Sequence, residues 1–467
     1  MYLNRTKLSG RIDSKLEKQL TETRDYWKNV LRRIIETILF LSGRGLPFRG
    51  SDEHFGSNHN GNYLGILELL SKFDPFLAQH IAVHGNQGKG HTSYYLSKTI
   101  CNEFIALIAN KTRTMNIDQL KKAGYFSISV DFTPDITHMD QLTIILKYVN
   151  NDGPVERFIT FIHITSHTGA NLALCLLNFL KENDINIENC RGQSYDNASN
   201  MSGTYTGMQA EIKKCNSLID YIPCIAHSLN IVGQSAVDCC VEAVSFFVTR
   251  WSANAEAVKA LFLSYENINE ALRKIQNDTL QKQSTRHQAS CLSSILGHLE
   301  TGIMCELWHN ILEPFNKCSK SIQSGIIDLY TEINLIESLK IVLQNIRNQY
   351  DEYESNGMKR AKNEDYKLTR HRKKFKRNES SFNELNAKES FKINTSYVII
   401  DQLYSVLVHR INAYTTVRDN FKLLSDISMN MQIEDIEGGM KKLLERYPKD
   451  FPDDFTNELV FRQRLYH

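Results

Sequence analysis

The sequence predicts an α/β core built on a mixed sheet in the order βββαβαβ, together with a helical amino-terminal region and a large all-α region. Three observations support this prediction. The apolar-polar alternation typical of strands is concentrated between residues 125 and 222, helical spacing dominates before it, and strand signals vanish after Ser235. The predicted domains are a mostly helical region at 1–120, a core at 121–240, and an all-helical domain at 241–467 that contains a basic linker at 356–380.

The amino-terminal region is predicted to begin with a long helix. Residues 16–41 contain no proline and place apolar residues near helical spacing, and the glycines and proline of 43–47 end the pattern. Residues 84–91 are rich in glycine and contain Lys89, but their spacing does not match a phosphate-binding P-loop, so we interpret them as a solvated loop.

The core is predicted to open with an antiparallel meander. Its first strand, Tyr125–Asp131, alternates apolar and polar residues and ends on a carboxylate. Strands at 141–149 and 155–164 follow, and the residue types of Asn150–Gly153 between them favour a tight turn.

The return of the chain to the first strand brings two acids together. Helical spacing after Gly169 predicts a crossover helix, and the next strand, 189–195, runs directly into Asp196. A right-handed crossover can place this strand parallel to the first, which puts Asp131 and Asp196 at the same end of neighbouring strands. Paired carboxylates suit a divalent cation that assists phosphoryl transfer. A short helix at 208–214 and a strand at 218–222 complete the order.

Four segments in this order resemble the hAT superfamily of DNA transposases and the transposase-derived proteins related to zinc-finger MYM-type and TTF-type proteins. They are SISVDFTPDITHMDQLTIILKYV, GQSYDNASNMSG, CIAHSLN and RWSANAEAV, and FLSGRGLPFRGSDE and HTSYYLSKTICNEF resemble the region that precedes the catalytic core in that group. The resemblance implies an RNase H-like core interrupted by a helical insertion.

The resemblance also implies roles for individual residues. Asp131 and Asp196 would be catalytic and would bind Mg²⁺ or Mn²⁺, while Cys224 and His227 would contact flanking DNA or order the site. The alternative for the latter two is a buried pair at a helix start, and a zinc site would need two further ligands at short spacing. Trp251, in Arg250-Trp-Ser, matches a residue that stacks on an extruded base, and its alternative is core packing.

Composition limits the partners and the compartment. The net charge of +2 indicates no general attraction to nucleic acid, so DNA contact would depend on local clusters. The densest basic run includes Arg372, Lys373 and Lys374, which could contact DNA, act as a nuclear-import signal, or only solubilise a loop. The ten cysteines form no regular framework and no run of eighteen apolar residues occurs, so we expect an intracellular protein without membrane association.

The third acidic ligand of the family is a glutamate in a carboxy-terminal segment that also dimerises, and no match to that segment is found. We therefore expect a nuclear, DNA-associated, transposase-derived protein that is catalytically inactive or truncated, with homo-oligomerisation left open. One alternative is metal-dependent DNA cleavage and strand transfer, with Glu434, Asp435 or Glu437 completing the site. Another is a non-enzymatic scaffold for protein partners.

Overall fold

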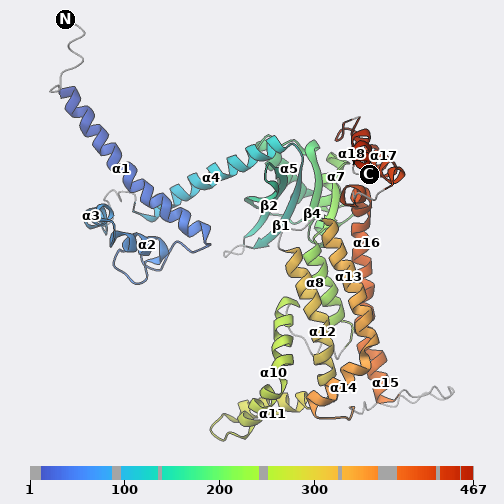
Figure 1. The fold of residues 1–467 in the computed structure, drawn as a ribbon. Helices are drawn as coiled ribbons and strands as arrows, with labels where there is room; N and C mark the ends of the chain where they lie inside the picture. The colour runs from blue at the N-terminus through green and yellow to red at the C-terminus, as the bar shows by residue number, and fades with distance from the viewer. Residues whose placement is uncertain are drawn as a thin grey trace. The chain divides into compact units, whose positions relative to one another are not determined.

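The computed structural model describes residues 12–86, 96–134, 139–240, 251–323, 329–366, 386–426, 432–452 and 454–465 (Figure 1). The chain divides into two compact units, Met1–Lys122 and Ala123–His467, called unit 1 and unit 2 below. Unit 2 contains both the sheet and the large helical region. Within the described residues no helix is long and apolar enough to cross a membrane.

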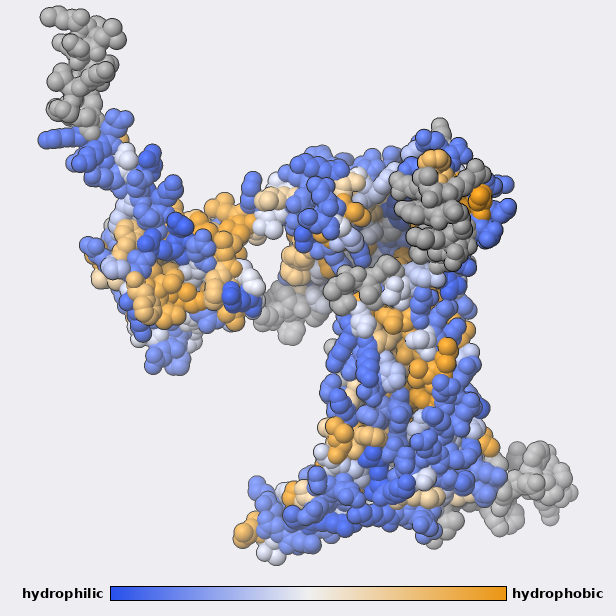
Figure 2. All heavy atoms as spheres, viewed as in Figure 1, coloured by the Kyte–Doolittle hydropathy of each residue, from blue (hydrophilic) through white to orange (hydrophobic). Residues whose placement is uncertain are grey.

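Unit 1 is helical, as predicted. Its helices are α1 (Ile12–Gly43), α2 (Gly61–Ser71), α3 (Pro75–His84) and α4 (Lys98–Ala123), the last of which reaches the boundary with unit 2. The apolar stripe of α1 packs on α2 and α3 through a core that includes Ile34, Leu67 and Leu77. Asp74 caps α3 by accepting hydrogen bonds from the backbone of Phe76 and Leu77. Figure 2 shows hydrophobic residues gathered on the surface of this unit. The exposed large hydrophobic residues of unit 1 include Phe40, Leu69, Leu70 and Phe73.

The sheet of unit 2 has five strands in the order β3-β2-β1-β4-β5. They are β1 (Phe126–Pro134), β2 (Asp140–Asn150), β3 (Gly153–His163), β4 (Cys190–Tyr195) and β5 (Asp220–Pro223). The pairs β1–β2 and β2–β3 are antiparallel, whereas β1–β4 and β4–β5 are parallel. The predicted meander and the parallel return strand are both confirmed.

One boundary differs from the sequence prediction. We expected the first strand to end at Asp131, but β1 continues to Pro134. The reason is that β2 stays paired with β1 as far as Pro134 opposite Asp140, although the last residue of β1 paired with β4 is Ser129, opposite Ser194. Asp131 therefore lies where β1 leaves its parallel neighbour, not where the strand stops.

The turn between β2 and β3 follows the chemistry of its residues. Asn150 pairs with Gly153, and the two residues between them form the connection. The Asn150 side chain accepts a hydrogen bond from the backbone N–H of Asp152, and Gly153 has a φ of +120°. Glycine adopts such an angle without a steric penalty, so the Asn-Asn-Asp-Gly segment fixes the register of the hairpin.

One face of the sheet forms the core of the α/β region. Phe126, Ile128 and Val130 of β1 are buried, and β2 alternates buried with less buried residues. The crossover segments contain α5 (Gly169–Glu182), the short η1 (Ile187–Asn189), α6 (Ser199–Ser202) and α7 (Met208–Cys215). The buried Gln193 of β4 donates from its side chain to the backbone oxygen of Gln209 in α7.

Every described element after β5 is helical. The helices are α8 (Ile225–Val237), α10 (Trp251–Asn277), α11 (Gln283–Leu296), α12 (Leu299–Ile322), α13 (Leu329–Asn348), α14 (Tyr350–Ala361), α15 (Ala387–Phe391), the π-helical η2 (Lys392–Tyr397), α16 (Val398–Asp426), α17 (Ile433–Arg446) and α18 (Phe455–Leu465). Pro314 lies inside α12 and does not end it.

One large apolar core is shared by α8, α10, α12, α13, α14, α15 and α16, whereas α17 and α18 pack in a separate cluster with Leu423 of α16. The large core includes Val232 of α8, Trp308 and Phe315 of α12, Leu343 of α13 and Leu407 of α16. Figure 1 shows α8, α12, α13 and α16 running side by side, away from the strands. The helix that follows β5 is thus built into the helical region, and α16 returns the chain to the sheet.

Candidate functional site

Asp131 and Asp196 come to the same end of adjacent strands. Ser129 of β1 and Ser194 of β4 are the last paired positions of the parallel ladder. Asp131 lies two residues further along β1, and Asp196 directly follows Tyr195, the last residue of β4. Because side chains in a strand alternate with a period of two, Asp131 projects on the face that carries Ser129. The sequence prediction that the two acids share one end of neighbouring strands is confirmed.

The two carboxylates differ in their surroundings. Asp131 is exposed, and its Oδ1 accepts a hydrogen bond from the backbone N–H of Phe132 at 2.9 Å. Asp196 is half-buried, and its Oδ1 accepts from the N–H of Ala198 at 3.1 Å. Each of these hydrogen bonds orients a carboxylate and involves only its Oδ1, so Oδ2 takes no part in it.

The charges of both aspartates affect the pKa of the Cys224 thiol. Cys224 follows β5, and its backbone N–H donates to the oxygen of Tyr195 at the end of β4. Burial raises the pKa of this thiol, and the negative charges of Asp131 and Asp196 raise it further, whereas the N–H groups of His227 and Ala226 oppose the shift. The neutral thiol thus lies close to both carboxylates.

Cys224 and His227 lie where the sequence placed them, at the start of a helix. Cys224 is the residue before α8, and His227 is in the first turn. Both are half-buried, so His227 retains some access to solvent. The structure brings Cys224 to the site, and the contact of Cys224 and His227 with DNA remains a prediction.

Two further residues reach the site from α16, and no pattern in the sequence indicated them. Arg410 Nη1 donates to Oδ1 of Asn197 at 3.0 Å, and Asn197 Nδ2 donates to Oγ of Ser228 at 3.1 Å. The hydroxyl of Tyr414 donates to the same Oγ at 2.8 Å. Burial raises the pKa of Tyr414 to about 12, so it is a neutral donor. The residue that follows Asp196 is therefore held from two sides.

A histidine lies on the same edge of the sheet. His167 Nε2 lies 3.0 Å from Oδ2 of Asp140, the first residue of β2, and its ring contacts that of Phe132 at 5.2 Å between centroids. The backbone oxygen of His167 accepts from Nδ2 of Asn200, in the segment after Asp196. The pairing of Asp140 with the end of β1 explains this position, but the sequence spacing did not reveal it.

An aromatic pair shares the sheet face of Asp131. In the strand register Asp131 is opposite Thr143, and Thr143 is opposite Phe161 of the edge strand β3. Phe158 lies next to Phe161, with 4.8 Å between ring centroids, and the two side chains are 51% and 55% exposed. Along the chain, Asp196 is thus followed by the polar contacts between Asn197, α8 and α16, whereas Asp131 shares its sheet face with exposed aromatic rings.

A comparison with known families covers the first part of the chain. Residues 3–207 match the family model DUF4371, described as "ZMYM1/FAM200, RNase-like domain". The match supports a transposase-derived, RNase-like family. It extends from unit 1 through β4 and Asp196 of the RNase-like domain, and it ends before α7 and β5.

The side chains around Asp131 and Asp196 fit a divalent metal only in part. Asp131 and Asp196 offer the carboxylate oxygens that Mg²⁺ or Mn²⁺ prefers. Within the described ranges, however, no group of three or more His, Cys, Asp or Glu side chains is arranged to hold a metal ion. The nearby Cys224 supplies a thiol that is held in its neutral form, and Arg410 supplies a positive charge. This donor set suits a single, weakly held ion and not a two-metal centre.

Several predicted nucleic-acid contacts lie outside the described residues. They are Arg250, Arg372, Lys373 and Lys374. Trp251 is the first residue of α10, and its side chain is also outside the described part. Its stacking role therefore remains a prediction.

The acids proposed to complete the site lie on α17. Glu434, Asp435 and Glu437 are all exposed. The last turn of α17 is bound to the other end of the sheet: Arg446 Nη2 donates to Asp220, the first residue of β5, at 2.9 Å, and the Tyr447 hydroxyl donates to the same carboxylate at 2.6 Å. The contacts of this helix therefore join it to the amino end of β5, opposite the end that carries Asp196.

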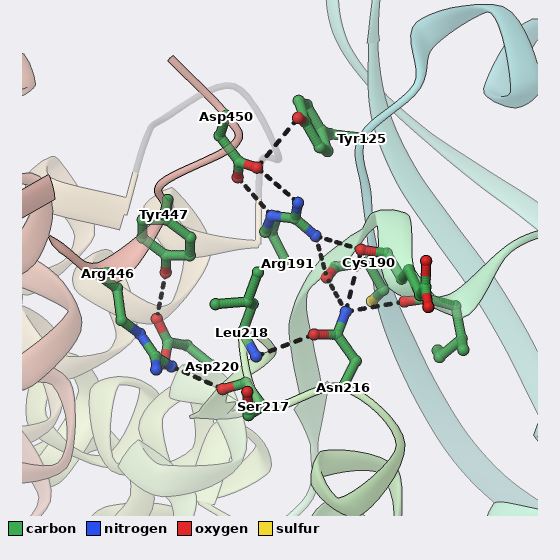
Figure 3. Close-up of polar contacts among 12 residues, drawn as sticks. Tyr125, Cys190, Arg191, Asn216, Ser217, Leu218, Asp220, Arg446, Tyr447 and Asp450 are labelled. Carbon is green, nitrogen blue, oxygen red and sulfur yellow. Dashed lines mark hydrogen bonds and ion pairs between the residues drawn. The ribbon is translucent and has the colours of Figure 1, made fainter. Parts of the chain in front are cut away.

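The polar network in Figure 3 joins residues 446–450, at the end of α17 and just after it, to the amino ends of β4 and β5. Arg191 of β4 makes a two-pronged ion pair with Asp450, at 2.5 Å and 2.7 Å, and the Tyr125 hydroxyl donates to Asp450 at 3.0 Å. Both side chains of the ion pair are largely buried, at 19% and 11% exposure. The network therefore anchors the turn after α17 to the sheet.

This ion pair predicts acid sensitivity. Hydrogen bonding from Arg191 holds the pKa of Asp450 below its usual value, against the opposing effect of burial. A depressed carboxyl pKa contributes stability above the unfolded value of about 4, and the contribution is lost as pH falls through the folded value. We expect Asp450→Asn to lower the melting temperature near neutral pH and the difference from wild type to shrink on acidification. Thermal melts across pH test this.

The turn residue Asp152 provides the control. It is exposed, and Asp152→Asn removes the same charge without removing an ion pair. A difference between wild type and Asp450→Asn that stays constant down to about pH 3 would contradict the assignment.

Proposed function

We propose that this protein is a transposase-derived, nuclear protein that binds DNA through its RNase-like domain without cutting it. The observation that supports the proposal most directly is that Asp131 and Asp196 each lie two residues beyond the last paired positions of the parallel β1–β4 ladder, Ser129 and Ser194. This arrangement fits an RNase H-like core, in which such a pair lies against the nucleic-acid backbone. The helices that follow β5 fit an insertion domain.

The neighbours of the acid pair favour binding over cleavage. Phosphoryl transfer with two metals requires enough ligands to hold both ions about 4 Å apart. Helix α16 presents the guanidinium of Arg410 to Asn197, the residue after Asp196, and the hydroxyl of Tyr414 to Ser228. Neither group is a metal ligand of the kind Mg²⁺ prefers. A fixed positive charge also weakens cation binding by repulsion.

Metal-dependent DNA cleavage is the second candidate. It is favoured by the exposed Asp131, whose second carboxylate oxygen can reach an ion. The interaction of His167 with Asp140 on the same edge of the sheet also favours it. In that case Mg²⁺ or Mn²⁺, held by the two aspartates, would supply Lewis-acid stabilisation of the phosphate.

The sign of one substitution separates the two candidates. Asp131→Asn removes an exposed negative charge without changing the shape of the side chain. If no metal is held, DNA affinity should rise about 5-fold, because a carboxylate and a phosphate 4 Å apart repel by about 1 kcal/mol in water. If a metal is held, the variant should instead lose Mn²⁺-dependent affinity and nicking.

The experiment uses the full chain with a labelled duplex and the corresponding single strand, with Mn²⁺ or with a chelator. Fluorescence anisotropy measures binding, and a denaturing gel detects nicking. Asp196→Asn is the companion variant, and Asp152→Asn is the control because Asp152 lies in the exposed turn between β2 and β3. Nicking that disappears in Asp196→Asn supports the enzyme. Failure of the wild-type chain to bind either DNA contradicts the proposal.

The aromatic pair predicts a preference for unpaired bases. Phe161 is exposed on the face of Asp131, and an exposed ring can stack on a base that has left the helix. We expect Phe161→Ala to weaken single-strand binding by about 1 kcal/mol or more, which is about 5-fold or more, and to affect duplex binding less. Phe73→Ala is the control, because Phe73 is an even more exposed ring on unit 1. Equal losses in the two variants would argue against a stacking role for Phe161.

A further inference from the structure

The guanidinium of Arg410 differs from those of other arginines in unit 2 because its described partner is not a carboxylate. On α16 itself, Arg418 pairs with Glu337 at 2.9 Å, and on α13 Arg347 pairs with Asp401 at 2.8 Å. Arg446 likewise pairs with Asp220. Within the described residues Arg410 has no carboxylate at ion-pair distance, and its one hydrogen bond goes to the neutral amide of Asn197. Its charge is therefore not neutralised by a described partner.

The local geometry fixes where this charge lies. Asn197 Nδ2 is engaged by Ser228, so the amide can turn only its Oδ1 toward Arg410. Arg410 Nε is buried and has no hydrogen-bond partner in the described part of the chain, while the residue as a whole retains partial exposure. The side chain is thus anchored at Nη1, one residue along the chain from Asp196.

We propose that Arg410 binds a phosphate of the nucleic-acid strand that passes the acid pair. This inference rests on the proposed function and names the group that makes it physically possible. Two carboxylates at one edge of the sheet repel a phosphodiester, so a nucleic-acid strand can approach them only if a positive charge compensates this repulsion. A guanidinium is suited to this task because its fork of N–H donors matches the oxygens of a phosphate.

A purely structural role makes a different prediction. If Arg410 served only to hold Asn197 and to balance the charge of Asp196, its removal would lower stability but leave the salt dependence of DNA binding unchanged. A phosphate contact releases a counterion, so losing one contact reduces the slope of log affinity against log salt by about one for duplex DNA and slightly less for a single strand. The slope therefore separates the two roles.

The test measures affinity of the full chain for a labelled single strand and a labelled duplex across a salt series. We expect Arg410→Gln to bind about 10-fold more weakly at about 0.1 M salt, with a slope smaller by about one. Arg410→Lys should keep the slope and lose part of the affinity, because it retains the charge but not the fork. Arg347→Gln is the control: it removes an equal charge from an exposed ion pair and should leave the slope unchanged.

The possible outcomes are distinguishable. If the wild-type chain binds DNA and Arg410→Gln has the same slope of log affinity against log salt as wild type, this inference is overturned but the proposed function remains intact. A wild-type chain that binds neither DNA overturns both. If circular dichroism shows that Arg410→Gln does not fold, Arg410→Lys decides: reduced affinity with a retained slope supports the phosphate contact, and unchanged affinity overturns it.

Discussion

Replacing Arg360 with alanine is expected to destabilise the helical part of unit 2 by about 3–5 kcal/mol. Arg360 of α14 forms an ion pair with Glu306 of α12, whose side chain is only 7% exposed. Removing the arginine leaves that carboxylate buried without its charged partner. The cost of such an unpaired charge exceeds the usual value of a surface ion pair.

Arg360 also supports a break in α10. Ser264 has non-helical backbone angles of φ −125° and ψ 22°, and Arg360 Nη1 donates at 2.6 Å to the backbone oxygen of Phe262 just before it. The guanidinium also lies 3.9 Å from the centroid of the Phe262 ring, which in turn stacks on His309 at 3.7 Å. One side chain thus connects α10, α12 and α14.

Urea unfolding followed by circular dichroism measures the effect of Arg360→Ala. Arg347→Ala is the matched control, because its ion pair is exposed, at 40% and 56%, and should change stability by at most about 1 kcal/mol. The double variant Arg360→Met/Glu306→Gln should be more stable than Arg360→Ala, since it removes both charges. Equal effects of Arg360→Ala and Arg347→Ala would contradict the buried-pair interpretation.

Gly302→Val should also destabilise unit 2, by about 3 kcal/mol. Gly302 of α12 and Gly357 of α14 face each other where the two helices cross. A Cβ atom on Gly302 would lie 2.5 Å from the backbone oxygen of Gly357, and one on Gly357 would lie 2.7 Å from the backbone nitrogen of Ile303. Because the obstacles are backbone atoms, the helices themselves must separate.

Gly438→Ala provides the opposite expectation. Gly438 is an exposed position inside α17, and a Cβ atom there meets nothing within 4 Å. Alanine should stabilise this helix by about 0.5–1 kcal/mol through its better helix propensity. Urea midpoints of both variants test the contrast, and a Gly302→Val chain as stable as wild type would show that the crossing can relax.

The local elements of the core were predictable because their signals are local. The alternation in 126–130 and the turn chemistry of Asn150–Gly153 each depend on a few neighbouring residues, and both appear in β1 and in the β2–β3 hairpin. The crossover rule allowed Asp131 and Asp196 to share one end of neighbouring strands, and the parallel pairing of β1 with β4 provides that arrangement. The end of β1 was wrong by three residues, because pairing with β2 extends the strand.

Periodicity and turn residues predicted the strands and their order along the chain, and the crossover rule allowed the two acids to share one end of neighbouring strands, because such signals need no knowledge of distant partners. The surroundings of those acids depend on the packing of the whole of unit 2. Arg410 is 213 positions from the Asn197 side chain that it contacts, and Asp450 is 259 positions from Arg191. Such contacts depend on how the helical region packs back on the sheet, and burial and charge neutralisation act through space without leaving a pattern along the chain.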